Sequence, residues 1–251
     1  FEKEIAHTKK VLLIELDEFI SSEKPSEPFI HIALANINYN YYSRKELYLS
    51  SKKIASHNLE IQYPENFFTY RDSIELNDNT LKNYYTYYQF INRYLDNLSH
   101  DSHKKQDPFF NKVSYSHQTQ KLKLIDSLIT NTQLHDNLLQ NTVKRYLVHA
   151  DDSQKEHDLV ALYKELDHNK AHQKEVERYA HNTAKINAGE LIPNLALITS
   201  SKELISIQKI NDSKTVFFFW SSESVKHYKE IHVRIAELKS KYPEYAFVGI
   251  N

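Results

Sequence analysis

Residues 215–220 read TVFFFW, and the polar stretch SSESVKH follows at residues 221–227. The first stretch is apolar at successive positions, which predicts a central strand buried by helices on both of its faces. After the polar stretch an apolar residue recurs every three or four positions, which predicts a helix over residues 224–241 with Ser224 as its N-cap. We expect the inner side of this helix to carry Val225, Tyr228, Ile231, Ile235 and Leu238.

Another apolar run, at residues 246–250, predicts a second buried strand after the helix. A strand, a helix and a parallel strand form a βαβ unit, whose crossover is right-handed. Two shorter apolar runs, at residues 195–198 and 204–207, predict further strands earlier in the chain. The sequence therefore predicts an α/β domain over residues 187–251.

The pattern of the first 186 residues is helical throughout. The clearest apolar stripe predicts a helix over residues 78–98, with Asn77 or Asp78 as its N-cap. Its members are Leu81, Tyr84, Tyr85, Tyr88, Ile91, Leu95 and Leu98. No fixed-period repeat is present, which argues against a helical solenoid. The predicted fold class is an α+β chain of two parts, an all-helical domain at 1–186 followed by the α/β domain at 187–251.

The helical part is rich in tyrosine, and the whole chain has 18. We expect most of these side chains to pack in the core, because a half-buried tyrosine buries area and keeps its hydroxyl wet. Tyrosine and asparagine also alternate in one short stretch and could line a groove for a glycan or a peptide. The stretch contains Asn36, Asn38, Tyr39, Asn40, Tyr41 and Tyr42.

The C-terminal part contains, in order, residues that mark a known family: Gly189, Pro193, Leu195, Leu197, Lys214, Phe219 and Trp220. With the helix and the closing strand at 248–251, this order resembles the thioredoxin-like domain of TlpA-type envelope oxidoreductases, in the form common in Bacteroidota. These proteins are related to thiol-disulfide interchange and AhpC/TSA-like proteins. The resemblance implies a partial thioredoxin-like fold, with further strands and a cis-proline loop after Asn251. It also implies a location in the periplasm or cell envelope.

The chain departs from this family at the redox motif. The family continues as FWxxWCxxC, whereas this chain reads FWSSESVKH from Phe219. Ser224 and His227 therefore occupy the two cysteine positions, and Glu223 stands beside them where the family has its second tryptophan. The chain contains no cysteine, and a serine hydroxyl neither ionises as a thiol does nor forms a disulfide. We expect no catalytic residue here, and Ser224 is better interpreted as a helix cap.

Two weaker interpretations concern histidines. His168 and His172 are four residues apart on an expected helix, near Glu165 and Glu175, and this spacing can hold zinc. With 14 histidines in the chain, chance explains the pair better, so we predict no metal and no other cofactor. Ser224 and His227 could also form a nucleophile and its base, but no third orienting group is evident.

Composition excludes several function classes. The 32 basic and 33 acidic residues nearly balance, so nothing indicates a nucleic-acid partner. Two glycines are too few for a phosphate loop or a dinucleotide fingerprint. No apolar run approaches the length needed to cross a bilayer. A membrane anchor in a removed N-terminal segment stays open.

These observations predict a thioredoxin-like envelope protein without redox activity, which binds or scaffolds a protein or peptide partner. One alternative is a thiol-disulfide or antioxidant enzyme whose active residues lie outside residues 1–251. The other is glycan or peptide binding by the Tyr/Asn-rich helical part.

Overall fold

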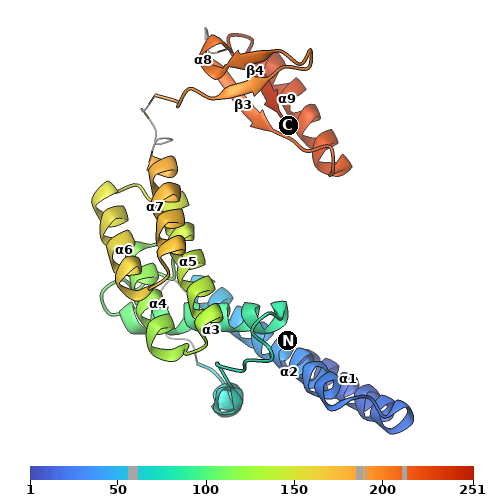
Figure 1. Ribbon diagram of the computed structural model, residues 1–251. Coiled ribbons are helices and arrows are strands. Elements are labelled where there is room, and N and C mark those ends of the chain that lie inside the picture. The colour runs from blue at the N-terminus through green and yellow to red at the C-terminus, as the bar shows by residue number, and fades with distance from the viewer. Residues whose placement is uncertain (56–61, 185–188, 190, 211–213) are drawn as a thin grey trace. The chain divides into compact units, whose positions relative to one another are not determined.

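The computed structural model describes residues 1–55, 62–184, 189, 191–210 and 214–251. The chain divides into two compact units, Phe1–Ala184 and Lys185–Asn251. The boundary expected between residues 186 and 187 lies outside the described residues. Each unit is considered by itself below (Figure 1).

The helical unit begins with two long helices, α1 (Glu2–Glu23) and α2 (Glu27–Ala55), which pack side by side (Figure 1). Lys24 ends α1 in the left-handed conformation, with a φ of 49°. Pro25 follows and cannot continue a helix, so the chain reverses there. A 3-10 helix, η1 (Glu65–Ser73), precedes α3 (Tyr85–His103), and α3 packs on α2.

Four further helices complete this unit: α4 (Tyr115–Leu128), α5 (Thr132–His149), α6 (Ser153–Leu166) and α7 (Lys170–Ala184). Side-chain oxygens cap three of them: Ser114 accepts a backbone hydrogen bond at the start of α4, Asn131 at the start of α5 and Asp152 at the start of α6. α5 packs against both α6 and α7. α6 and α7 also contact each other, so the last three helices form a small bundle.

The helix predicted over residues 78–98 begins later than expected, at Tyr85, and ends at His103. The predicted cap at Asn77 or Asp78 is wrong. Asp78 Oδ1 instead accepts hydrogen bonds from the backbone N–H and the hydroxyl of Thr80, at 2.8 and 2.6 Å. Such a local Asp turn competes with helix formation. The Tyr87 hydroxyl, 3.1 Å from the Asp78 N–H, also holds this segment in place.

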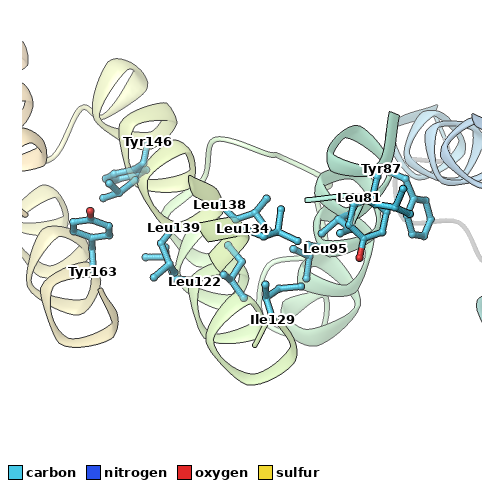
Figure 2. Packing of buried hydrophobic residues seen from close by; sticks show 14 of the residues in the cluster. Leu81, Tyr87, Leu95, Leu122, Ile129, Leu134, Leu138, Leu139, Tyr146 and Tyr163 are labelled. Atoms are coloured by element: carbon cyan, nitrogen blue, oxygen red, sulfur yellow. The ribbon is translucent and has the colours of Figure 1, made fainter. Parts of the chain in front are cut away.

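One apolar core runs through the helical unit, and Figure 2 shows ten labelled members of it from α3, α4, α5 and α6 and the adjoining turns. Phe90, Ile91 and Leu95 are fully buried on α3. Tyr39 and Tyr42 of α2 are each 8% exposed and belong to the same core. The packing interpretation of these two tyrosines is thus confirmed.

The C-terminal unit contains α8 (Ile207–Ile210), α9 (Val225–Lys241) and four strands. β1 (Ala196–Ile198) and β2 (Leu204–Ser206) form an antiparallel hairpin. β3 (Thr215–Phe219) pairs in parallel with β4 (Ala246–Ile250), and α9 is the crossover between them. The predicted strand–helix–parallel strand order is confirmed. The two pairs form separate sheets among the described residues, so the coarse α/β character stands without a complete thioredoxin-like sheet.

The expectation that β3 is buried on both faces is wrong for the described residues. Val216 is 36% exposed and Phe219 is 69% exposed. The inner side of α9 also buries fewer residues than predicted. Of the five expected residues only Ile235 is buried, and Val225 and Tyr228 are exposed. A two-stranded sheet with one helix offers too little surface to cover its apolar side chains.

Among the residues that the structure describes, no helix has both the length and the apolar character needed to span a bilayer.

Candidate functional site

The head of α9 is the first candidate site. It holds the residues that match the redox motif of the family named in the sequence analysis, namely Trp220, Glu223, Ser224 and His227. β3 leads into it, and the Trp220 N–H donates to the Ile250 carbonyl at 3.0 Å, which extends the pairing with β4 by one residue. Ser224 is the N-cap of α9, as predicted. Its Oγ accepts a hydrogen bond from the His227 backbone N–H at 3.4 Å.

The side chains at this position do not form a catalytic pair. The Ser224 hydroxyl is occupied with the helix backbone, and the structure shows no hydrogen bond from it to the His227 ring among the described contacts. Glu223 and His227 are exposed. A nucleophile needs a base within hydrogen-bond reach, so the geometry does not bring Ser224 and His227 together for acyl transfer.

An aromatic cluster packs between the end of β3 and the first turns of α9. The Trp220 ring lies 5.3 Å from the Tyr228 ring and 5.5 Å from the His232 ring, measured between centroids. Phe218 contacts His232 in the same way, at 5.7 Å. A Cβ on Gly249 would lie 2.8 Å from the Phe218 ring, so the strand must carry a glycine here. Phe218 and Trp220 therefore face α9.

The opposite face of this sheet carries apolar side chains as well. Side chains alternate along a strand, and paired residues of parallel strands share a face. Phe217 pairs with Val248, and Phe219 pairs with Ile250. These four residues point away from α9, and we call them the open sheet face. Sequence reasoning found the apolar run but predicted a second covering helix, which the described residues do not supply.

The helical unit contains buried charges that sequence reasoning missed. Asp96 of α3 is 1% exposed and accepts from Lys121 of α4, which is 2% exposed, at 2.5 Å. Lys112 approaches the other carboxylate oxygen at 3.1 Å, and the His117 ring lies 3.5 Å away. The two lysines hold the pKa of Asp96 well below its ordinary range against the opposing effect of burial. We call these four residues the Asp96 cluster.

A sequence signal accompanies one member of the Asp96 cluster and two buried histidines beside it. Asp96, His100 and His103 follow one another at steps of four and three, beside the apolar stripe of α3. All three are buried. His103 Nε2 lies 3.4 Å from His117 Nδ1, and burial lowers the pKa of both rings. The network joins α3 to α4 and needs no ligand to balance its charge.

A break in the helix separates His168 and His172, the pair considered as zinc ligands from the sequence and set aside. α6 ends at Leu166, and α7 begins at Lys170. The break has a local cause, because Asp167 Oδ1 accepts from the Asn169 N–H at 2.7 Å and Asn169 Oδ1 accepts from the Ala171 N–H at 3.0 Å. The prediction of one helix across this region is wrong, and His168 lies exposed in the turn.

His172 instead faces carboxylates that the sequence pattern did not connect with it. Its Nδ1 lies 3.6 Å from Asp167 Oδ2 and 3.8 Å from Asp136 Oδ2 of α5. Glu175 points elsewhere and pairs with Lys144 at 2.6 Å. Asp167 and His172 are five residues apart, but Asp136 lies about 30 residues earlier on α5, so local spacing could not have revealed the complete group.

The Tyr/Asn stretch of α2 is divided between core and surface. Tyr39 donates its hydroxyl hydrogen to the Glu75 carbonyl at 3.0 Å and cannot face a ligand. Asn36 and Asn40 are exposed, and Tyr41 is half-buried. The cavity beside Tyr39 is too small to hold a water molecule.

Comparison of the chain with known proteins identified no matching family model, no similar curated protein and no similar solved structure.

Proposed function

We propose that the protein is a thioredoxin-like binding protein without redox activity, and that the C-terminal unit makes the contact with its partner. The observation that carries the proposal is the head of α9. The helix begins at Val225, after a short turn that follows β3 and Trp220, at the place where the family has its nucleophilic thiol, and the Ser224 hydroxyl caps it. The hydroxyl can still cap the helix, but it cannot carry out thiol-disulfide exchange.

The open sheet face supports a binding role. Phe219 is 69% exposed, and Ile198 and Leu204 of the hairpin are 73% and 78% exposed. Isolated apolar residues on a surface are ordinary, but several on one small unit mark an interaction surface. A partner that presents an amphipathic helix fits best, because a helix is the element that covers a parallel sheet in α/β proteins.

The proposal places the protein in the periplasm or cell envelope, which the family resemblance alone supports. Fractionation of the native host tests this location, and recovery of the protein only with cytosolic markers would contradict it.

The redox part of the proposal is tested with a disulfide-reduction assay on insulin. We expect the unaltered protein to show no turnover above buffer. The double variant Ser224→Cys/His227→Cys then tests the resemblance itself, because a thiol at a helix N-terminus has a pKa below the ordinary value of about 8.5. Residues three apart on a helix lie at a separation that a disulfide can join.

Alkylation rates against pH report the thiol pKa of Ser224→Cys, with Ser221→Cys as the matched control before the helix begins. A depressed pKa at position 224 alone supports the thioredoxin-like helix head. An ordinary pKa at both positions contradicts it, and insulin turnover by the unaltered protein contradicts the absence of redox activity.

The binding part is tested with the variant Phe219→Glu, which puts a charge on the open sheet face, and with Glu223→Gln as a control. Labelled amphipathic helical peptides with a leucine stripe serve as probes in fluorescence anisotropy. We expect the unaltered protein and the control to bind and Phe219→Glu to lose binding. Equal binding by all three proteins, or binding by none, contradicts the assignment of this face.

A further inference from the structure

The strongest unexplained feature of the helical unit is a pair of carboxylates with no cationic partner of the ordinary kind. The Asp167 side chain is 0% exposed, and the Asp136 side chain is 15% exposed. Within the described part of the chain, neither has a lysine or arginine at ion-pair distance. A buried carboxylate without compensating charge is costly, so the site calls for a positive charge from another source.

We infer that Asp136, Asp167 and His172 form a binding site for a divalent transition-metal cation that links α5, the end of α6 and α7. One ligand atom from each residue lies within 4.8 Å of the other two. Imidazole nitrogen and carboxylate oxygen are the ligands that zinc and its neighbours in the first transition row accept.

The distances suit such an ion. Zinc bonds of about 2.0–2.2 Å in a tetrahedron separate ligand atoms by about 3.4 Å. The two separations from His172 Nδ1, 3.6 Å to Asp167 and 3.8 Å to Asp136, are within a few tenths of an ångström of that value. They are too long for hydrogen bonds. The three ligand atoms therefore lie near one another without hydrogen bonds between the ring and either carboxylate.

The nitrogen at the centre of this arrangement lacks a partner. His172 Nδ1 is buried as an atom and makes no hydrogen bond within the described structure. A buried polar atom that is left unpaired requires an explanation, and an ion is one of the few available. The His172 side chain as a whole is 31% exposed, which leaves a path for the cation to enter.

Neighbouring residues hold the two carboxylates in place. The buried Tyr163 hydroxyl, at the edge of the cluster in Figure 2, donates to Asp167 Oδ2 at 2.5 Å. His135 Nδ1 lies 3.2 Å from Asp136 Oδ1, which leaves Oδ2 for the site. Such outer contacts orient metal ligands in proteins. Three protein ligands leave at least one coordination position for water.

His172 must present a lone pair at Nδ1, so its proton has to reside on Nε2. Nε2 lies 3.3 Å from the side-chain nitrogen of Asn169. Asn169 Oδ1 already accepts from the Ala171 N–H, so the amide presents its donor and not an acceptor to Nε2. The variant Asn169→Asp supplies an acceptor to Nε2 with its second carboxylate oxygen, while the first continues to cap the helix.

Titration of the metal-free protein with Zn²⁺ in a calorimeter tests the site, and Co²⁺ absorbance reports its coordination. We expect one ion per chain, a higher Tm in its presence, and visible Co²⁺ bands of tetrahedral intensity. His172→Ala and Asp167→Asn should each weaken binding by at least about tenfold. His168→Ala removes an exposed ring that follows Asp167 in the chain but belongs to no part of the site, so it is the matched control and should bind as the unaltered protein does.

Circular dichroism confirms that each variant is folded before titration. Zn²⁺ affinity unchanged in both His172→Ala and Asp167→Asn would overturn the site, because binding would then belong to other histidines. No binding by the unaltered protein at submillimolar Zn²⁺ would overturn it as well.

Discussion

Two buried aspartates of the helical unit have opposite surroundings. Asp96 lies between Lys121 and Lys112 and needs nothing more. Asp167 is equally buried, but its charged neighbours are a second carboxylate, Asp136, and the ring of His172. The first arrangement joins two helices with charges of the chain itself. The second, as we propose, binds a cation from solution, which is the difference between a structural ion pair and a binding site.

Removing the carboxylate of Asp96 tests the aspartate whose charge is balanced by lysines of the chain. Of the changes predicted here, it should lower the free energy of unfolding most. Asp96→Ala leaves Lys121 buried without its partner. We expect the free energy of unfolding to fall by about 3–5 kcal/mol, measured by urea denaturation. Lys164→Ala, which breaks an exposed pair with Glu177, should cost at most about 1 kcal/mol. A similar small loss from both changes would show that the Asp96 cluster is not a stabilising unit.

Much of the fold could be predicted from the sequence, because periodic apolar positions determine where helices and strands lie. The helix N-cap at Ser224 and the parallel pairing of β3 with β4 follow from local pattern alone. The start of α3 could not be predicted. The local turn in which Thr80 bonds to Asp78 has no periodic signal, and the Tyr87 hydroxyl reaches the Asp78 N–H only after the chain has folded.

The candidate sites divide in the same way. The head of α9 is continuous in sequence and was visible from residues 220–227. Asp136, Asp167 and His172 meet only because α5, α6 and α7 pack together. Sequence spacing pointed instead to His168 as the companion of His172, and the short turn after α6 removes it. A side chain that completes a site across three helices leaves no signal in local spacing.

Tyr163 lets the second aspartate be probed without changing its charge. Tyr163→Phe removes the hydroxyl that donates to Asp167 and leaves the ring. Hydrogen bonds to charged groups contribute about 1.5–3 kcal/mol, and we expect a loss of that size in metal-free protein by urea denaturation. Tyr115→Phe, on a half-buried ring with no such donor contact among the described ones, is the control. Equal losses of unfolding free energy in the two variants would mean that the hydrogen bond from Tyr163 to Asp167 adds no stability of its own.

The Asp96 cluster also makes stability depend on pH. Burial lowers the pKa of His117, although Asp96 opposes this shift. As pH falls below about 6.5, His117 takes up a proton in the unfolded chain but stays neutral in the folded chain, because its pKa is lower there. The folded state therefore loses stability. We expect His117→Gln to flatten this part of the curve of unfolding free energy against pH, and His168→Gln to leave it unchanged. If the unaltered protein and both variants have the same slope, the pH dependence of stability comes from other groups and not from His117.

The smallest expected effect belongs to Asp167→Asn in the absence of metal, and it separates the two aspartates most directly. Asparagine keeps the shape and removes a charge that repels Asp136. We expect the unfolding free energy to change by less than about 1 kcal/mol, against about 3–5 for Asp96→Ala. With Zn²⁺ present, the unaltered protein should gain stability that the variant does not gain. A loss in metal-free Asp167→Asn as large as that of Asp96→Ala would mean that Asp167 already has its balancing charge within the folded chain.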